Sequence, residues 1–332
     1  MLNKLKNTTA LVGAFSLAAT ASFAEMKITA SLEQTLASHS QDLAANKVSG
    51  TSGFGQESSI YVGGGRDLAG GVKATYGFDI EMDGTAAKQD YKFLTLTSGA
   101  FSVTVGEDVG DNLQATVIPF VSDNFETIGG STGAGLSFDS HGASGLNPHE
   151  VGHVGLSYNY GAGQATVRYA PNNIAAGGDS TIVNGTSAME YLVSGKVQGV
   201  GYRVGRMQQE KSSSGVLGSK PDYTVYGLSY QMGGFTVGAE KRKTDDGTIA
   251  TTAETDATQY GIAYATKDFS AGIYMLKNDR NDTVEDEEAK MIQIGYNIGG
   301  LGFDVSYMQI ENASFASGAD ADVYQIRTVQ KF

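Results

Sequence analysis

The sequence contains no cysteine and no tryptophan, and it has only 4 prolines among 332 residues. Without cysteine the chain cannot build a disulfide framework, a redox thiol or a thiolate metal site. Stretches with the i, i+3, i+4, i+7 apolar spacing of an amphipathic helix are scarce beyond the N-terminus. Basic residues are also few, since 23 Lys and Arg against 36 Asp and Glu give a formal net charge of −13. A nucleic-acid-binding protein is expected to carry a basic surface, so this balance argues against a nucleic-acid partner.

The residues that are abundant favour β-structure. The chain has 45 glycines, 17 tyrosines and 14 phenylalanines. Tyrosine, valine and threonine are typical of strands, and glycine is typical of the tight turns that join them. The composition therefore indicates many short strands rather than a helical fold.

The N-terminus has the pattern of a secretory signal peptide. Lys4 and Lys6 form a basic start, a small apolar run follows from Ala10 to Ala21, and residues 22–24 are Ser-Phe-Ala. This pattern predicts that residues 1–24 are removed after Ala24, and that the mature chain, residues 25–332, is exported. Loss of the two lysines takes the formal charge from −13 to −15. Beyond Ala24 no apolar run approaches the ~20 residues of a membrane-spanning helix.

Apolar and polar residues alternate along most of the mature chain. From Val72 to Met82, for example, every second residue is apolar and the residues between them are polar or glycine. A period of two is the signature of a strand with one apolar face. The polar segment 40–55 is expected to be a connection. The pattern predicts about sixteen strands, over residues 26–39, 58–65, 72–82, 91–97, 101–105, 153–160, 165–169, 188–197, 200–209, 223–232, 235–243, 258–266, 269–277, 290–298, 301–310 and 321–332.

Three regularities across these strands distinguish a membrane barrel from a water-soluble sandwich. Tight connections such as Gly233-Gly234 and Gly299-Gly300 alternate with long polar ones, aromatic residues flank the tight turns, and one face of each strand is apolar. A soluble sandwich also alternates, but its aromatics have no reason to gather beside the short turns. A transmembrane barrel needs all three features, because its outer face meets lipid and its sheet must close. The sequence therefore predicts an all-β, antiparallel, up-and-down transmembrane barrel in the bacterial outer membrane. A secreted all-β protein is the alternative.

One long insert interrupts the alternation. Residues 106–150 show no sustained period and are rich in turn residues, yet they contain Phe120, Phe125 and Leu136, which are too apolar for a simple tether. The insert also has no Lys or Arg. A barrel of about sixteen strands encloses a water channel, and only this connection is long enough to fold in and narrow it. We expect residues 106–150 to be a pore-constricting third loop.

Charged side chains on the insert and on the strands are the candidate pore-lining residues. Rings of charge set ion preference in pores, so an acidic loop opposite a basic wall would create a transverse field. The loop candidates are Asp108, Asp111, Asp123, Glu126 and Asp139. Strand parity places the wall candidates on the polar, lumen-facing side: Lys27, Lys73, Arg168, Lys196, Arg203, Arg242, Arg327 and Lys331.

The C-terminal strand resembles the closing strand of bacterial outer-membrane proteins, with a terminal Phe332 and with Ile326 and Tyr324 at alternate positions before it. This pattern is an expected assembly signal. More widely, the mature chain resembles Gram-negative general diffusion porins of the alphaproteobacterial (Rhodobacter-like) type. The resemblance is carried by residues 99–110 (GAFSVTVGEDVG), by Asn147-Pro148 and by residues 157–160 (SYNY). It implies a sixteen-stranded trimeric barrel whose acidic third loop faces basic wall residues.

The sequence thus predicts a porin: a passive, water-filled channel for small hydrophilic solutes and ions, without catalytic residues. Outer-membrane lipid and lipopolysaccharide are its expected surroundings, and mild cation preference follows from its charge. One alternative is a surface adhesin that binds through its long loops. Another is an outer-membrane hydrolase, although no nucleophile motif accompanies the histidines.

No cofactor is expected. His141, His149 and His153 match no zinc spacing. Loosely bound Ca²⁺ at acidic loops, such as the segment around Asp279, Asp282, Glu285 and Glu288, is a weaker alternative.

Overall fold

The structure is a computed structural model that describes residues 25–43, 46–83, 86–107, 113, 115–121, 152–171, 187–210, 212–213, 216–217, 222–245, 254–281, 283–312 and 317–332. The proposed signal peptide, residues 1–24, lies outside the described residues. In the described part of the chain, no helix combines the length and apolar character that a membrane-spanning helix needs.

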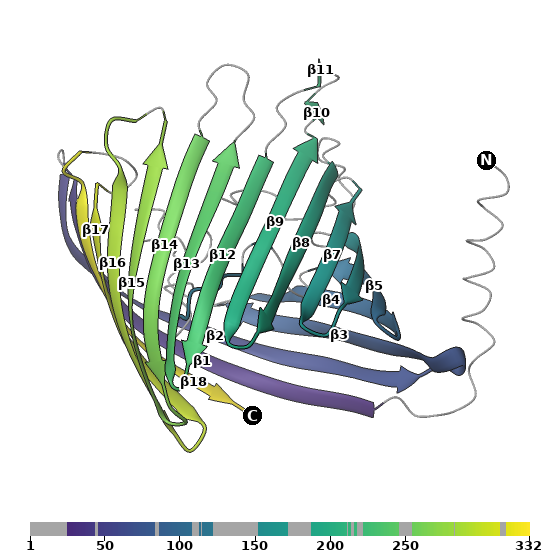
Figure 1. Ribbon diagram of the computed structural model, residues 1–332. Helices are drawn as coiled ribbons and strands as arrows, with labels where there is room; N and C mark the ends of the chain where they lie inside the picture. The colour runs from purple at the N-terminus through teal and green to yellow at the C-terminus, as the bar shows by residue number, and fades with distance from the viewer. Residues whose placement is uncertain are drawn as a thin grey trace.

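The described residues form a closed barrel of sixteen antiparallel strands (Figure 1). Each barrel strand is hydrogen-bonded to its neighbours along the chain, which is an up-and-down topology, and the first strand pairs with the last. This confirms the predicted fold class. The strands are β1 (Glu25–Leu43), β2 (Asn46–Asp67), β3 (Val72–Asp83), β4 (Ala86–Ser98), β5 (Phe101–Glu107), β6 (His153–Asn159), β7 (Gly163–Ala170), β8 (Ser187–Val197), β9 (Val200–Glu210), β12 (Asp222–Met232), β13 (Phe235–Asp245), β14 (Glu254–Ala265), β15 (Phe269–Arg280), β16 (Glu287–Ile298), β17 (Leu301–Glu311) and β18 (Asp320–Lys331).

All long connections lie at one end of the barrel, which also has the two-residue connections from β1 to β2 and from β3 to β4. At the opposite end the connections are short, and two-residue turns join β8 to β9, β12 to β13 and β16 to β17. The turn after β16 has Gly299 and Gly300 at φ 59° and 98°, which is the left-handed backbone of a tight hairpin turn and favours glycine. At the other end lie the longer connections, one of which contains the small hairpin of β10 (Ser212–Ser213) and β11 (Val216–Leu217). A 3₁₀ turn, η1 (Ala69–Gly71), joins β2 to β3 at the short-turn end.

The barrel closes where β1 meets β18. Their register runs from Ser31 opposite Lys331 to Asp42 opposite Asp320. The ladder extends to the chain end, because the N–H of Phe332 donates to the carbonyl of Ala30 at 2.8 Å and the N–H of Ala30 donates to the carbonyl of Phe332 at 3.2 Å. No strand of the barrel is therefore left with an unpaired edge at this seam.

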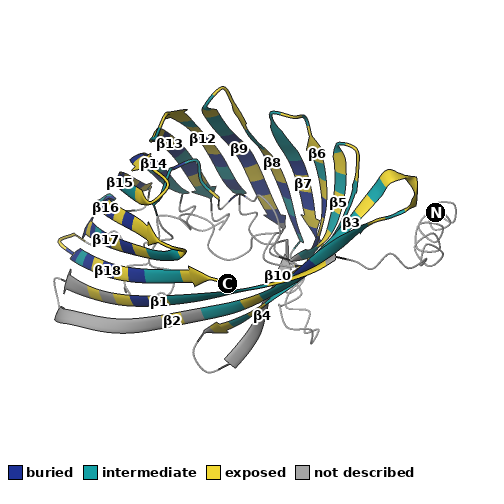
Figure 2. Cartoon of the chain, turned by 90° about the horizontal axis from the view of Figure 1, so that it is seen from below, coloured by how far each residue is buried: buried dark blue, intermediate teal, exposed yellow. Residues whose placement is uncertain are grey.

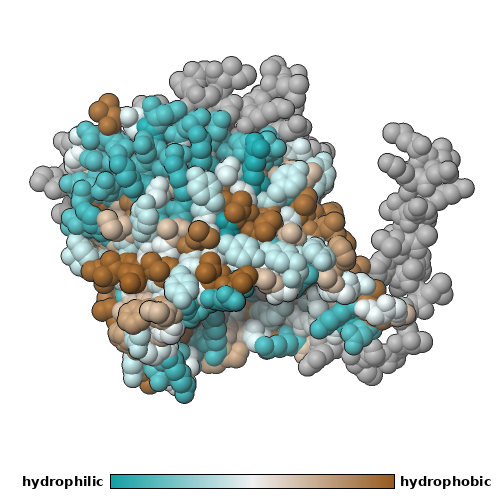
Figure 3. Space-filling model, viewed as in Figure 1, coloured by the Kyte–Doolittle hydropathy of each residue, from teal (hydrophilic) through white to brown (hydrophobic). Residues whose placement is uncertain are grey.

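Alternation along each strand separates an outer apolar face from an inner face (Figure 2). On β13, Val237 is 51% exposed and faces outward, whereas Glu240 and Arg242 face inward and are 2% and 0% exposed. On the face seen in Figure 3, apolar residues gather into a band across the middle, and hydrophilic residues lie toward the end with the long connections. A hydrophobic outer surface around a polar interior is the arrangement of a membrane barrel.

Aromatic pairs cross neighbouring strands at the short-turn end of this band. The rings of Phe101 and Tyr158 lie 4.8 Å apart, and those of Phe235 and Tyr264 lie 4.7 Å apart. These pairs are the aromatics that the sequence places beside the tight turns. Tyrosine at such a depth keeps its ring in the apolar band and its hydroxyl near water.

The expected connection over residues 40–55 is wrong. β1 continues to Leu43 and β2 begins at Asn46, so most of this polar segment is strand. The pairing continues past an irregularity between His39 and Gln41, and ends with Leu43 opposite Asn46. Backbone hydrogen bonds pair two strands whatever side chains they carry, so a polar segment without alternation can still form a hairpin. Hydrophobic alternation therefore ends before the strand does.

A charge on the outer band should destabilise the barrel according to its depth. Ile294 is 50% exposed within β16, whereas Ile298 is 59% exposed beside the tight turn. We expect Ile294→Lys to lower the free energy of unfolding by about 2–4 kcal/mol, and Ile298→Lys by about 0–1 kcal/mol. Urea unfolding in lipid vesicles, followed by circular dichroism, measures both. Equal losses for the two variants would contradict the assignment of the band.

Candidate functional site

Part of the long insert lies inside the barrel. Leu113 and residues 115–121 rest on the inner face of the wall between β9 and β16. The N–H of Val117 donates to Glu240 Oε2 on β13 at 3.1 Å. Tyr274 on β15 donates its hydroxyl to the carbonyl of Pro119 at 2.9 Å, and the N–H of Val121 donates to Gln293 Oε1 on β16 at 3.1 Å. This part of the predicted inward-folded loop is therefore attached to three strands.

Side chains of the wall are needed as partners because the segment has no strand beside it. A buried backbone N–H or carbonyl without a partner is costly, and Pro119 cannot donate at all. Within residues 115–121 there are short local bonds, from the Ile118 N–H to Thr116 Oγ1 at 3.0 Å and from the Phe120 N–H to the Ile118 carbonyl at 2.9 Å. The polar groups of β13, β15 and β16 provide further partners.

Glycines on the inner wall make room for this close approach. A Cβ added to Gly205 would lie 2.1 Å from Leu113, one added to Gly227 would lie 2.6 Å from Val117, and one added to Gly261 would lie 2.7 Å from Ile118. A real Cβ does not come this close to another heavy atom, so a side chain at any of these positions would shift the loop side chain that it meets. Gly238 and Gly295 are in the same situation, since an added Cβ would meet Val117 and Val121. We call the five inner-wall glycines that face the loop the glycine track: Gly205, Gly227, Gly238, Gly261 and Gly295.

Apolar contacts anchor the segment at two points. Leu113 is fully buried in a cluster with Leu192, Met207, Tyr223 and Val225. Burial of one such leucine side chain contributes about 1.5–3 kcal/mol.

The second anchor is Ile118, which is buried against the inner faces of β14 to β18. Phe120 packs against this cluster, with its ring 4.7 Å from that of Tyr274. The two anchors and the three wall hydrogen bonds fix the segment against the wall.

The inner face is consequently less polar than the alternation predicts. It carries large buried apolar side chains on seven strands, where glycine, hydroxyl, amide or charged residues are expected for a water channel. Part of the inner wall packs against other residues of the same chain. The pattern of a single strand does not show which of its inward side chains are buried in this way. These side chains are Leu192, Met207, Tyr223, Val225, Tyr274, Leu276, Met291, Met308, Ile310 and Val323.

Three of the predicted wall arginines are buried and paired with carboxylates of the wall. Arg168 contacts Glu190 on the neighbouring strand. Arg242 Nε lies 2.6 Å from Glu240 Oε1, on the same strand. The pair also holds the loop, since Arg242 donates to the carbonyl of Ala115 at 3.4 Å while Glu240 accepts from Val117.

Arg327 on β18 pairs with two carboxylates. Its Nε lies 3.0 Å from Asp304 Oδ2 on β17, and its Nη1 lies 3.1 Å from Glu33 Oε2 on β1. It therefore links three strands across the barrel seam. Removal of one partner of a buried ion pair leaves an uncompensated charge, which costs about 3–5 kcal/mol. These arginines are ion-paired structural groups, whose charges are largely offset within the wall.

The remaining wall candidates differ in burial. Arg203 on β9 is 4% exposed and lies in the interior. Lys27, Lys73, Lys196 and Lys331 are exposed near the short-turn end, and Lys196 contacts Gln231. The wall residues predicted as one basic face are therefore divided between a buried, paired middle and an exposed rim.

The other candidates can be placed only in part. Asp108, Asp111, Asp123, Glu126 and Asp139 lie outside the described residues, so their position opposite the wall stays a prediction. The predicted assembly-signal residues lie on or beyond β18, where Tyr324 and Ile326 are exposed on the outer face and Phe332 is exposed at the chain end.

The metal and histidine predictions rest on little of the described chain. His153 is buried at the start of β6, and His141 and His149 lie outside the described residues. Among the described residues, no group of three or more His, Asp or Glu side chains is placed to hold a metal ion. Calcium at the acidic loops stays a prediction.

The wall carboxylates and the glycine track were missed by the sequence analysis. Glu240 and Arg242 are two residues apart in a strand and so share a face, a spacing that could have revealed their pairing. Asp304 and Arg327 are register partners, and register becomes visible only when the strands are paired.

Comparison with known proteins gives three results. A family model described as Gram-negative porin matches residues 8–297. An anion-selective porin from Comamonas acidovorans superposes with a TM-score of 0.71 at 15% identity, covering 93% of this chain and 100% of that one. A triple mutant of Rhodopseudomonas blastica porin superposes with a TM-score of 0.63 at 13% identity, with the same coverage. No curated protein sequence matches.

The glycine track can be tested by adding a side chain beneath the loop. A Cβ at Gly261 meets Ile118, whereas a Cβ at Gly302, also on the inner face, meets only the carbonyl of Val329 at 3.6 Å. We expect Gly261→Val to displace residues 115–121 and to change the unit conductance in planar bilayers, because the segment can no longer lie against β14. Gly302→Val is the matched control and should have the unit conductance of the unmodified channel. Identical conductance of the two variants would show that the close approach has no influence on the bore.

Proposed function

Because the chain belongs to the Gram-negative porin family, it forms an outer-membrane channel for passive diffusion, and we propose that residues 106–150 filter its solutes by size and charge. One observation carries the proposal: the segment from Leu113 to Val121 is seated inside the barrel and attached to β13, β15 and β16. A sixteen-stranded barrel has an aqueous lumen that side chains alone do not fill. A segment fixed in that lumen reduces its cross-section.

We further propose a mild cation preference. The wall arginines Arg168, Arg242 and Arg327 are offset by wall carboxylates, so they contribute little net positive charge. The insert has carboxylates and no Lys or Arg, and the whole chain has a formal net charge of −13. Charge that lines a pore decides which ion enters more readily. The Comamonas porin is anion-selective by name, but at 15% identity the likeness extends to the fold alone.

Export and assembly complete the proposal. The signal peptide, residues 1–24, would be cleaved after Ala24, and β1 begins at the next residue, Glu25. Tyr324, Ile326 and Phe332 would form the assembly signal. The barrel would assemble as a homotrimer, as the sequence resemblance implies. A gel of unboiled protein tests this, because a trimer migrates at about three times the mass of the boiled chain.

The protein is a channel rather than an enzyme, and we propose that it catalyses no reaction. Neither rival from the sequence, the adhesin or the hydrolase, is favoured by the family match. Lipid and peptide hydrolysis assays on the purified protein should remain at background.

Conductance tests the function directly. Purified protein added to a planar bilayer should insert in steps of large, uniform current. Deletion of residues 112–145 should raise the current of each step, because it removes the segment from the lumen. An unchanged step would place the loop outside the ion path. Since the deletion removes Leu113 and Ile118 from the apolar clusters of the inner wall, circular dichroism and the gel shift of unboiled protein should first establish that the barrel is folded.

The reversal potential in a salt gradient tests the charge filter. With a tenfold KCl gradient, we expect a potential of the sign that indicates cation preference, and a smaller value at high salt because mobile ions screen the charges. Replacement of Asp123, Glu126 and Asp139 by the corresponding amides should lower the reversal potential measured in the same KCl gradient. Anion preference of the unmodified channel would refute the proposal.

A further inference from the structure

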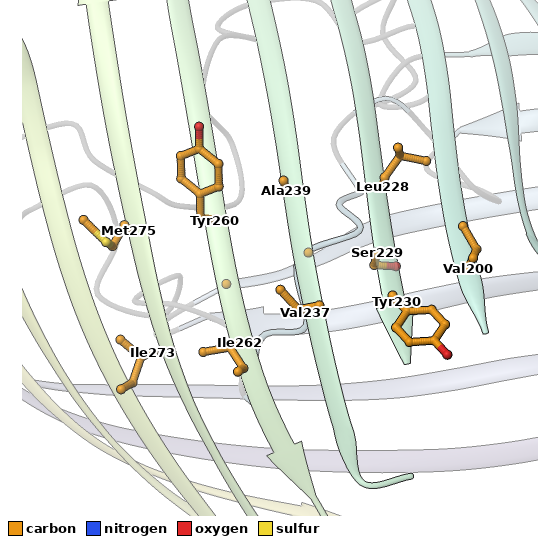
Figure 4. Close-up of a pocket in the computed structure, with 12 residues that line it drawn as sticks. Val200, Leu228, Ser229, Tyr230, Val237, Ala239, Tyr260, Ile262, Ile273 and Met275 are labelled. Carbon is orange, nitrogen blue, oxygen red and sulfur yellow. The ribbon is translucent and has the colours of Figure 1, made fainter. Parts of the chain in front are cut away.

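A groove of about 690 Å³ lies over the outer faces of β12 to β15. Leu228, Val237 and Ile262 on its surface are apolar (Figure 4). In a membrane these side chains meet hydrocarbon, so the groove offers few hydrogen-bond partners to a hydrophilic solute. The partners of a transported solute therefore lie on the inner face of the barrel.

The inner faces of β3 to β5 are more open to the lumen than the wall that carries the loop. Beneath the loop, inward side chains such as Val225 and Met291 are buried. On β3, β4 and β5 the inward side chains of Thr75, Thr95 and Ser102 are partly exposed. The described segment of the loop covers the wall between β9 and β16, so a solute that passes it moves along β3 to β5.

Hydroxyl side chains form two rows on this side of the lumen. In the first row, the side chains in register on β3, β4 and β5 are Thr75, Thr95 and Thr104. The second row lies nearer the short-turn end, and its side chains in register on β4 to β7 are Thr97, Ser102, Ser157 and Thr166. We call these seven side chains the hydroxyl rows.

Neighbouring hydroxyls within the rows are hydrogen-bonded in pairs. Thr95 Oγ1 lies 2.8 Å from Thr104 Oγ1, and Thr97 Oγ1 lies 2.9 Å from Ser102 Oγ. A hydroxyl has one donor and two acceptor lone pairs, so each pair retains a donor and several lone pairs for a ligand. The hydroxyl rows can therefore both donate to and accept from the hydroxyls of a solute.

Two aromatic rings lie over the next row, farther from the short-turn end. Tyr61 on β2 and Phe93 on β4 face inward and are partly exposed. Both rings reach the same glycine of β3, since a Cβ added to Gly77 would lie 2.8 Å from Phe93 Cε1 and 2.8 Å from the Tyr61 hydroxyl oxygen. Tyr61 also lies over Gly63, where an added Cβ would be 2.5 Å from its Cζ. The two rings therefore rest against the backbone of the wall and have their other faces toward the lumen. We call Tyr61 and Phe93 the aromatic platform.

The aromatic platform and the hydroxyl rows together match the two kinds of surface on a sugar. A pyranose ring has a face of C–H bonds, which packs on an aromatic ring, and an edge of hydroxyls, which donate and accept hydrogen bonds. Successive inward positions of a strand lie about 6.6 Å apart, so Phe93 and Thr95 are spaced to contact adjacent parts of one sugar.

The charged side chains around this surface are of both signs. Lys73 lies in register with Asp67 at the short-turn end, and Asp79 lies beyond the aromatic platform, in register with its tyrosine. Arg168, on the far side of the first hydroxyl row, is paired with Glu190. With two positive and three negative groups the surface has no excess of positive charge for an anion, whereas its hydroxyls suit a neutral polar solute.

We propose that the aromatic platform and the hydroxyl rows form a weak carbohydrate-binding site on the solute path. The platform packs against the C–H face of a pyranose, and the hydroxyl rows exchange hydrogen bonds with its hydroxyls. Binding is weak because a transported solute must leave as readily as it enters. The inference rests on the channel function of the family, but not on the proposed charge filter.

Planar-bilayer conductance in the presence of neutral solutes tests the site. Maltose, which consists of pyranose rings, should reduce the unit current in KCl along a saturable curve. Sorbitol has hydroxyls without a ring, and poly(ethylene glycol) of similar mass has neither a ring nor a hydroxyl edge. Both should reduce the unit current only in proportion to the conductivity of the solution.

Two variants separate the contributions of the platform and the rows. Phe93→Leu removes the ring but keeps an apolar side chain, and it should raise the half-saturating maltose concentration about fivefold. Thr95→Val combined with Thr104→Val removes both members of one hydroxyl pair, so neither is left without its partner, and it should cause a similar rise.

Matched controls make the same substitutions elsewhere on the barrel. Phe235→Leu removes an outward ring of β13, and Thr236→Val removes an inward hydroxyl of the same strand, across the barrel from β4. Both controls should keep the half-saturating maltose concentration of the unmodified channel. The unit current without sugar should be the same in all variants, which shows that the channel is intact.

A maltose response that is linear, matched by sorbitol or unchanged in Phe93→Leu would overturn the proposal. If the unmodified protein gave no current steps, the channel function would fail instead, and saturation-transfer NMR of the detergent-folded barrel with maltose would still decide on the site. Transfer to the ring C–H protons of maltose that is weaker in Phe93→Leu supports the site. No transfer, or equal transfer in Phe93→Leu, refutes it.

Discussion

Closure of the backbone hydrogen-bond ladder is the constraint on which the rest of this structure depends. In hydrocarbon, each unpaired N–H or carbonyl costs several kcal/mol, so a membrane sheet cannot have an open edge. Here β18 returns to β1, and the mutual bonds of Ala30 and Phe332 extend the seam to the chain end. Closure makes every strand two-faced, with lipid outside and a lumen inside. At sixteen strands the lumen is wide, and this leaves space for a segment of chain within it.

The same demand for partners governs the loop inside the lumen. Residues 115–121 have no neighbouring strand, so Glu240, Tyr274 and Gln293 provide their hydrogen bonds. The glycine track lets the segment approach the wall, and the apolar clusters around Leu113 and Ile118 hold it there. Glu240 takes part in both structures, because it binds the loop backbone and offsets Arg242. The position of the loop and the charge balance of the wall therefore both depend on the Glu240 side chain.

The outer and inner faces differed in how well the sequence predicted them. The outer face has a uniform solvent, so alternation alone located the strands and tight turns, including Gly299-Gly300. The inner face varies from place to place. Met291 and Met308 are buried on the inner face in the cluster that Ile118 joins, and Arg168 and Arg327 are paired because a carboxylate is near in register. The hairpin that contains Leu43 and Asn46 was missed because its sequence is polar and shows no apolar alternation.

The sequence by itself determined the export pattern, the two-faced strands, their approximate number and the one insert long enough to enter the lumen. These are local features, readable from residues a few positions apart. The tertiary structure decided which side chains meet: the pairing of Arg327 with Asp304 and with Glu33 across the seam, and the position of Ile118 against Gly261. Local periodicity determines which face of the sheet a side chain takes. It does not determine the neighbour of that side chain, because the register between paired strands and the path of the loop set the neighbour.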